Sequence, residues 1–316
     1  MVIVNFTFAQ PIGHSYHTYF ALKSIIHLSG SNRTVALITF PIVLILGTFG
    51  NTAGFLVMSS RRFRRFSYAN YLMVLSLADL LQCISLTGMP LWEYALKSVN
   101  FSSVGQCLAY EFVFQFAFSW STTLIVIITA ERVLVVVFPF TSRVICTVKC
   151  SRRVMLAMLV PNTLAASHMF FGMRFSEQLK CHYYSFNFQR QLYFYIVTFS
   201  YAVPCVLLIV SNMVIVIFMR RGLKVGETGR KTAKARRTTI MLITVSLAFV
   251  VTTLPNTITS FLPIPKHIVD YFYTMFTVIT SLNYSLNFYI YLLLGSEVRM
   301  FVLEKITCRT DAKFAR

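Results

Sequence analysis

The sequence predicts an all-α integral membrane protein, namely a bundle of seven transmembrane helices followed by a short amphipathic helix. Composition is the first observation behind this prediction, because 56% of the 316 residues are hydrophobic and only 12% are charged. Soluble domains carry about twice that share of charged residues, so this chain belongs in a bilayer. The second observation is a set of seven apolar stretches, each long enough as a helix to cross a hydrocarbon core of about 30 Å. They cover approximately residues 35–58, 70–92, 108–138, 154–173, 192–219, 238–263 and 269–294.

A helical bundle is the only spanning architecture that suits these stretches. The strands of a membrane barrel are about ten residues long and alternate in polarity, and such segments are not found here. The chain therefore divides into an extracellular N-terminal tail (1–34), a seven-helix domain (35–294) and a cytoplasmic C-terminal segment (295–316). No basic region precedes the first apolar residues, so the first span is expected to serve as an uncleaved anchor.

The C-terminal segment begins with an amphipathic stretch at residues 296–306. Val298, Phe301 and Ile306 recur there at helical spacing, as a helix that lies in the membrane interface requires. Cys308 follows this stretch directly. It is a candidate palmitoylation site, because cysteines beside amphipathic helices at the membrane are common acceptors of that lipid.

The distribution of positive charge predicts the orientation. The net charge is +19, and placing the connecting segments alternately on two sides of the membrane puts all but seven of the 29 Lys and Arg residues on one side. By the positive-inside rule the N-terminus is extracellular and the C-terminus cytoplasmic, as in a multi-pass protein of the plasma membrane. The basic clusters are therefore expected to set topology and to touch anionic membrane lipids, and nucleic acid is not an expected partner. The seven exceptions are Lys23, Arg33, Lys97, Arg174, Lys180, Arg190 and Lys266.

Glycosylation and cysteine placement agree with this orientation. Sequons begin at Asn5, Asn32 and Asn100, all on the side predicted to be extracellular. Cys107 and Cys181 are the only pair of cysteines on that oxidising side. A disulfide that ties the start of the third span to the second outer loop is therefore expected.

No sequence motif indicates an enzyme. The chain has no glycine-rich phosphate loop, no G-x-S-x-G and no H-E-x-x-H, and its six histidines are scattered. We therefore expect no catalytic residues and no cofactor, with one exception: a sodium ion.

The exception rests on polar residues inside the spans. Asp79 lies near the middle of the second span, where a carboxylate costs about 2.5–3.5 kcal/mol on insertion scales, so a compensating partner is expected. Asn283 and Asn287 lie four residues apart on one face of the seventh span, and the third span supplies Ser121. These four residues could hold a small cation such as sodium, or hydrogen-bond a protonated Asp79. The alternative is a purely structural polar cluster that holds the helices together.

Several short motifs occur in a characteristic order along the spans. They are Gly50-Asn51, Leu75-Ser76-Leu77-Ala78-Asp79-Leu80-Leu81, Cys107, Glu131-Arg132-Val133, Cys181, Pro204, Phe249 with Pro255, and Asn287-Phe288-Tyr289-Ile290-Tyr291. Any one of them alone is weak, but their joint order and spacing resemble the rhodopsin-like (class A) G-protein-coupled receptors over about residues 35–308.

Some positions depart from that pattern. Val133 replaces the tyrosine of the family's Asp-Arg-Tyr motif, although the Glu-Arg charge pair is kept. Phe288 replaces the proline of the seventh span, so the usual kink there is expected to be weaker. Thr253 stands where the sixth span usually carries an aromatic switch, and the fourth span lacks its common tryptophan. These differences affect the switching pathway rather than the architecture.

The resemblance implies a mechanism in which an outer ligand shifts a helix bundle between two arrangements. Arg132 lies 25 residues after Cys107, which is about 37 Å along one helix, so the third span links the outer surface to the inner one. The resemblance implies that Glu131 holds Arg132 at rest and that activation frees Arg132 toward a heterotrimeric G protein. A snorkelling interfacial cation is the alternative role for this arginine. The residues that the resemblance assigns to activation and coupling are Glu131, Arg132, Tyr291, Thr239, Phe249, Pro255 and Pro204.

The ligand class is narrowed mainly by exclusion. Phe114 occupies the position where amine receptors have an aspartate, and Ser281 takes the place of the lysine that binds retinal in opsins. The candidate pocket combines the outer half of the third span with the sixth span, although such a stripe also suits simple helix packing. Its residues are Glu111, Phe114, Gln115, Phe118, Asn256, Thr257 and Ser260.

The long second outer loop and short third inner loop resemble those of peptide receptors. An extracellular peptide, such as a neuropeptide or peptide hormone, is therefore the expected ligand, and acidic residues such as Glu111 would attract a basic one. Two alternatives stay open: a chemosensory receptor for small molecules on the same fold, and an ion-coupled transporter or channel, because intramembrane Asp and Asn residues also mark ion pathways.

Overall fold

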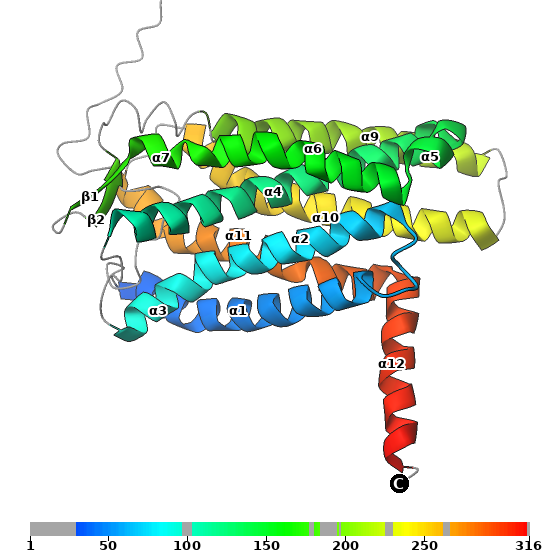
Figure 1. Ribbon diagram of the computed structural model, residues 1–316, viewed down its shortest axis with the longest axis horizontal. Helices are drawn as coiled ribbons and strands as arrows, with labels where there is room; N and C mark the ends of the chain where they lie inside the picture. The colour runs from blue at the N-terminus through cyan, green and yellow to red at the C-terminus, as the bar shows by residue number, and fades with distance from the viewer. Residues whose placement is uncertain are drawn as a thin grey trace, which may run out of the picture.

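The computed structural model describes residues 30–96, 103–176, 180–183, 195, 197–224, 230–261 and 266–314. Long helices run side by side along one axis, and the last helix leaves the bundle at a steep angle (Figure 1). In chain order the helical elements are α1 (Gly30–Met58), α2 (Ser67–Cys83), the π-helical segment η2 (Ile84–Gly88), α3 (Met89–Leu96), α4 (Val104–Val137), α5 (Pro139–Ile145), α6 (Val148–Ser167), α7 (Met169–Gly172), the π-helical segment η3 (Val197–Ala202), α9 (Val203–Lys224), α10 (Arg230–Phe261), α11 (Lys266–Leu294) and α12 (Ser296–Phe314).

The predicted all-α class is confirmed, and each predicted span lies largely on one helix or on consecutive helical segments. The bundle consists of α1, α2 with its continuation into α3, α4, α6, α9, α10 and α11. In it α4 is central, because it packs against α2, α6, α9 and α10, whereas α11 packs against α1, α2 and α10. The fold therefore places α4 in contact with four other helices of the bundle.

The described helices of the bundle differ in whether they are long and apolar enough to span a membrane. Among the described residues, five helical segments are long and apolar enough to cross a bilayer, and the bent pair of α11 and α12 would make a sixth. The fourth span was predicted at 154–173, whereas α6 begins at Val148 and ends at Ser167. The helix therefore includes basic residues in its first turns, Arg152 and Arg153 among them, and these lower its hydropathy.

The helix α1 approaches its neighbours through small residues. A methyl group added to Gly47 would come within 2.5 Å of the Cys83 sulfur, and one added to Gly54 would come within 2.9 Å of the Ser76 hydroxyl. Both contacts are shorter than atoms tolerate, so only glycine permits this packing against α2. Small residues spaced in this way are typical of helix pairs in membranes, where close backbone approach replaces the hydrophobic driving force.

Polarity is distributed as a bilayer requires. Large apolar side chains such as Ile45, Phe49 and Val251 are exposed on the outside of the bundle. The interior holds apolar residues together with fully buried polar ones such as Asp79 and Ser121. An apolar exterior around a partly polar interior suits surrounding lipid rather than water.

One end of the bundle carries a short β-hairpin that the sequence had not indicated. Its strands are β1 (Met173–Ser176) and β2 (Lys180–Tyr183), which pair antiparallel with Phe175 opposite Cys181. The hairpin contacts α4 and lies at the left of Figure 1, and we call this the hairpin end.

At the opposite end the chain turns sharply from α11 into α12, and we call this the α12 end (Figure 1). The two helices are bent by 88° at Gly295. A methyl group on Gly295 would come within 2.5 Å of the Tyr291 carbonyl oxygen, so the bend requires a residue without a side chain. The predicted amphipathic helix thus begins at Ser296, directly after this bend.

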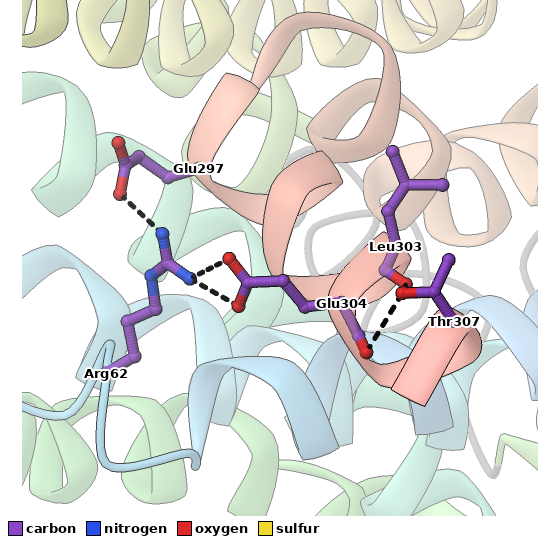
Figure 2. Close-up of polar contacts among 5 residues, drawn as sticks. All are labelled: Arg62, Glu297, Leu303, Glu304 and Thr307. Carbon is purple, nitrogen blue, oxygen red and sulfur yellow. Dashed lines mark hydrogen bonds and ion pairs between the residues drawn. The ribbon is translucent and has the colours of Figure 1, made fainter. Parts of the chain in front are cut away.

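The loop between α1 and α2 holds α12 in place. Arg62 donates hydrogen bonds to both carboxylate oxygens of Glu304, at 3.2 and 3.0 Å, and lies 3.5 Å from the carboxylate of Glu297 (Figure 2). The neighbouring Phe63 is buried and meets the ring of Phe301 edge to face, with ring centroids 5.7 Å apart. The contact between the loop and α12 therefore combines an ion-pair cluster with an aromatic pair.

Candidate functional site

A buried ion pair lies near the α12 end of α4. Arg132 donates a hydrogen bond from Nη2 to Oε1 of Glu131 at 2.8 Å, and both side chains are less than a tenth exposed. The same carboxylate oxygen accepts a hydrogen bond from the Ser67 hydroxyl at 2.6 Å. The guanidinium group of Arg132 also lies over the ring of Tyr68, 5.2 Å from its centroid. Glu131 is therefore held by both α2 and its own helix, and it holds Arg132 in turn.

The arginine is not fully satisfied by these contacts. Its Nε atom is buried and has no hydrogen-bond partner in the described part of the chain. Because guanidinium groups have five N–H donors in a fixed fork, this arginine keeps capacity for a further acceptor. Arg132 therefore pairs with Glu131 inside the bundle and does not extend to the membrane surface. This arrangement disfavours the snorkelling role.

The other residues assigned to activation lie on α9, α10 and α11. Thr239 on α10 is buried and donates to the carbonyl of Ala235 on its own helix at 3.0 Å. Tyr291 on α11 and Phe249 on α10 are almost completely buried in the main hydrophobic core. Pro204 lies at the start of α9, directly after the π-helical segment η3.

In the turn before Pro255, threonine hydroxyls bond to backbone carbonyls of the same helix. Pro255 lies within α10, where its ring removes one backbone hydrogen bond. One turn earlier, Thr252 donates to the carbonyls of Ala248 and Phe249, and the buried Thr253 donates to that of Phe249. The hydroxyl of Thr253 therefore bonds to the backbone of its own helix.

The predicted cluster at Asp79 forms in the middle of the bundle. Its carboxylate is completely buried and accepts a hydrogen bond from Ser121 at 2.6 Å through Oδ1 and one from Asn287 at 2.6 Å through Oδ2. These bonds join α2, α4 and α11. Among the described residues, no positively charged side chain bonds to either oxygen.

Asn283 is placed differently from the other three members of the cluster. It is buried on α11, one turn before Asn287, and neither its oxygen nor its nitrogen has a hydrogen-bond partner in the described part of the chain. A buried amide with no partner costs about 1–3 kcal/mol. The residues therefore fit a small cation, which would supply charge for Asp79 and bind the Asn283 oxygen, or a water, which would hydrogen-bond to the Asn283 amide.

The candidate pocket residues of α4 face the interior of the bundle. Glu111, Phe114, Gln115 and Phe118 are each at most 4% exposed. The ring of Phe118 packs against Tyr201 of η3 with centroids 4.5 Å apart.

On α10, Thr257 is buried and donates to the carbonyl of Thr253 at 3.0 Å. The side chains of Asn256 and Ser260 lie outside the described residues, although the backbone of both belongs to α10.

Glu111 differs from the other buried carboxylates. No hydrogen bond or ion pair to its side chain is found among the described residues, whereas Asp79 and Glu131 both have partners. It lies three residues before Phe114, on the half of α4 nearer the hairpin end.

Several predicted modification sites can be placed only in part. Cys107 is disulfide-bonded, and it lies on the first turn of α4 near the hairpin that carries Cys181. The pairing of these two residues stays a prediction, because the side chain of Cys181 lies outside the described residues, as does that of Cys308. Asn32 lies on the first turn of α1. Asn5 and Asn100 lie outside the described residues.

One polar bridge had not been expected from the sequence. Asn212 on α9 donates to the Ser246 hydroxyl on α10 at 2.8 Å, and Ser246 lies 3.1 Å from the Asn212 oxygen, with both residues buried. The signal was present, because each residue lies in a largely apolar segment and polar groups inside a membrane need partners. The sequence alone could not tell which helix would provide the partner.

Comparison with known families agrees with this geometry. A family model described as 7 transmembrane receptor (rhodopsin family) matches residues 51–291. The match includes the Asp79 cluster, the Glu131–Arg132 pair and the candidate pocket. The comparison with curated proteins finds no match for the chain.

Proposed function

Because this chain belongs to the rhodopsin family of seven-transmembrane receptors, we propose that it is a plasma-membrane receptor that transmits the binding of an extracellular ligand to heterotrimeric G proteins. Family membership makes it a receptor rather than an enzyme, and it favours this class over the transporter or channel. The G protein and the nature of the ligand are the parts that we propose.

We propose that the hairpin end is extracellular and the α12 end cytoplasmic. The α12 end carries the basic cluster of the loop after α1, Arg61, Arg62, Arg64 and Arg65, and the basic start of α10. Cytoplasmic segments are enriched in such residues. The disulfide-bonded Cys107 lies at the other end, where oxidising conditions would preserve the bond.

The observation that carries the G-protein proposal is the buried pair of Glu131 and Arg132 at the cytoplasmic end of α4. Arg132 is buried with one acidic partner, and its Nε has no hydrogen-bond partner within the residues that the structure describes, so another acceptor can bind it. We propose that the arrangement described is the resting one and that activation moves the cytoplasmic end of α10 outward. The space so opened would admit the G protein to Arg132.

The movement of α10 would strain two features of the structure. One is the hydrogen-bonded pair of Asn212 and Ser246, which holds α9 against α10. The other is the segment around Pro255, where the missing backbone hydrogen bond allows bending. The hydroxyls of Thr252 and Thr253 bond to carbonyls four residues earlier in the same region, and such bonds favour a bend in the helix.

The test measures nucleotide exchange on added heterotrimeric G proteins in membranes from expressing cells, without any agonist. Glu131→Gln weakens the hold on Arg132, and a bias of about 1–2 kcal/mol would raise basal exchange about 5- to 30-fold. Arg132→Ala in the same background should return exchange to the level of untransfected membranes, while surface expression is retained.

Two controls make this result specific. Ser67→Ala removes the second partner of Glu131 and should raise exchange in the same direction as Glu131→Gln, because it also loosens the carboxylate. Glu304→Gln removes one negative charge at an exposed site and should leave exchange unchanged. Exchange that stays high in the Glu131→Gln and Arg132→Ala double variant would reject the assigned role of Arg132.

We infer that the ligand is a peptide with a basic group that pairs with Glu111. This buried carboxylate lies on the extracellular half of α4 beside the aromatic rings of Phe114 and Phe118, and it has no partner among the described residues. A buried carboxylate without a partner is costly, so a cationic group in the ligand would be strongly favoured there. A small cationic molecule could also pair with the Glu111 carboxylate, as the chemosensory alternative would require. The experiment below therefore examines both kinds of ligand.

The ligand test begins with a synthetic library of secreted peptides applied to one expressing cell line. For each active peptide, Glu111→Gln should lower potency by at least about tenfold, because a hydrogen bond to a charged group contributes about 1.5–3 kcal/mol. Glu304→Gln is the charge-matched control and should leave potency unchanged. Unchanged potency in Glu111→Gln for every active peptide would reject this ligand class, and activity confined to small molecules would favour chemosensory detection.

A further inference from the structure

A groove lies at the α12 end between α10 and the junction of α11 with α12. Its volume is about 290 Å³. In Figure 1 the α12 end of α10 lies on the side of the bundle where α11 bends into α12. The residues that line it are Arg237, Ile240, Leu293, Leu294, Ser296 and Arg299.

The lining has two chemically distinct parts. Leu293 is 72% exposed, and Ile240 and Leu294 are each 39% exposed, so apolar side chains form an outward-facing wall. Such exposure is unfavourable in water but suits contact with acyl chains. The other part is polar and positively charged, because Arg237 comes from α10 and Arg299 comes from α12.

No carboxylate in the described part of the chain neutralises the two arginines. Arg299 donates from Nη1 to the carbonyl oxygen of Leu293 at 3.3 Å, which holds its side chain at the groove. Neither Arg299 nor Arg237 forms an ion pair within the described residues, and both are exposed. Two acidic residues of α12, Glu297 and Glu304, instead bind Arg62 (Figure 2).

We propose that this groove binds an anionic phospholipid of the leaflet at the α12 end. The phosphate lies between Arg237 and Arg299, with the Ser296 hydroxyl as a further donor, and the acyl chains lie against the wall of Ile240, Leu293 and Leu294. A volume of 290 Å³ is at the lower limit of small-molecule pockets, so it suits a headgroup rather than a whole lipid.

Charge and apolarity together favour a lipid over other anions. A free phosphate would be satisfied by the arginines but would leave the exposed leucines unused. The proposal requires only that the α12 end lie at the boundary between lipid and water, so it does not depend on the ligand or on coupling to a G protein. Its failure would therefore be distinguishable from failure of the proposed function.

The experiment counts lipids bound to the purified full-length receptor by native mass spectrometry in detergent, with phosphatidylserine and phosphatidylcholine added at equal concentration. Each basic residue near a membrane surface contributes about a fivefold preference for anionic lipid. The Arg237→Gln and Arg299→Gln double variant should therefore bind phosphatidylserine at least about tenfold more weakly than the unmodified receptor.

The matched control is the double variant Arg236→Gln and Lys305→Gln. It makes the same change in net charge on the same two helices, but neither residue lines the groove. It should bind phosphatidylserine as the unmodified receptor does. Arg237→Lys with Arg299→Lys keeps the charge and should retain most of the binding, which provides a readout if the glutamine variant is poorly folded.

Three results would overturn the proposal. Equal loss in the groove and control variants would show only a general attraction of basic surfaces for anionic lipid. Equal binding of phosphatidylcholine would remove the role of the arginines. Displacement of phosphatidylserine by millimolar inorganic phosphate, as effective as displacement by the lipid itself, would show a site for free phosphate instead.

Discussion

Asp79 and Glu131 are two buried carboxylates whose hydrogen-bond and ion-pair partners differ. Glu131 is neutralised by Arg132 and receives a second bond from Ser67. Among the described residues, Asp79 receives bonds from the neutral side chains of Ser121 and Asn287 alone. A buried negative charge with only neutral partners needs a cation or a proton, so at this scale the site remains open to an ion.

We predict that sodium stabilises the receptor through Asp79. If the sodium concentration is about ten times its dissociation constant, binding adds about 1.4 kcal/mol, which corresponds to a rise of about 2–4 °C in the unfolding temperature. The measurement compares thermal unfolding in sodium chloride and in choline chloride at equal ionic strength. Asp79→Asn should remove the difference between the two salts.

The control for the sodium experiment is Asn212→Ala, which disrupts another buried polar contact between helices. This variant should unfold at a lower temperature in both salts while keeping the difference between them. A receptor whose unfolding temperature is the same in both salts would leave a structural polar cluster as the role of Asp79.

At the scale of elements, three different kinds of contact hold α12 against the bundle. Its bend depends on Gly295, its apolar side meets Phe63 through Phe301, and its acidic side meets Arg62. The ion-pair cluster lies at the surface, where Glu304 is 61% exposed, and exposed pairs contribute only about 0–1 kcal/mol. The aromatic pair involves a fully buried partner and should contribute more.

We therefore predict that Phe301→Ala destabilises the attachment of α12 more than Arg62→Gln does. The loss of the aromatic pair and of buried area should cost about 1–3 kcal/mol, against at most about 1 kcal/mol for the ion pairs. Hydrogen exchange of the backbone amides of α12 measures this attachment directly. Faster exchange in Arg62→Gln than in Phe301→Ala would show that the charges dominate.

On the scale of the whole molecule, an apolar exterior and an uneven charge distribution define how the bundle lies in a membrane. The connection between α5 and α6 at the α12 end carries Cys146, which is half-buried and free. Burial raises the pKa of the Cys146 thiol to about 11, and the nearby Glu131 carboxylate adds to the rise, while Arg132 opposes it. This thiol reports both on orientation and on its local environment.

We predict that a membrane-impermeant maleimide labels Cys146 only after the cells are permeabilised. Labelling is followed in a receptor that also carries Cys150→Ala and Cys308→Ala, with Cys146→Ser as the control that should lose the signal. The thiolate is the reactive form, and the raised pKa keeps its fraction low at neutral pH. The labelling rate should therefore increase about tenfold for each pH unit between pH 7 and 9. Labelling of intact cells would reverse the proposed orientation.

Some of the candidate site could be predicted from the sequence, because its residues obey local or one-helix rules. Asn283 and Asn287 share a helix face by spacing alone, and Glu131 is adjacent to Arg132 in the chain. An aspartate in an apolar span must find partners, so the cluster of Asp79, with Ser121 and Asn287 bound to it, was expected. The bonds of Asn212 to Ser246 could not be predicted, because they depend on how α9 and α10 are rotated against each other.

By itself the sequence determined the class of the protein and the order of its long apolar helices, because a bilayer leaves helices as the solution for long apolar stretches. The count of basic residues also predicts which end of the bundle faces the cytoplasm. Only the tertiary structure decided what lies across a helix interface: that Ser67 shares Glu131 with Arg132, that Asn283 has no partner among the described residues, and that Arg237 and Arg299 meet at one groove. The physical reason is that these contacts depend on the rotation and bending of packed helices, which spacing along the chain does not specify.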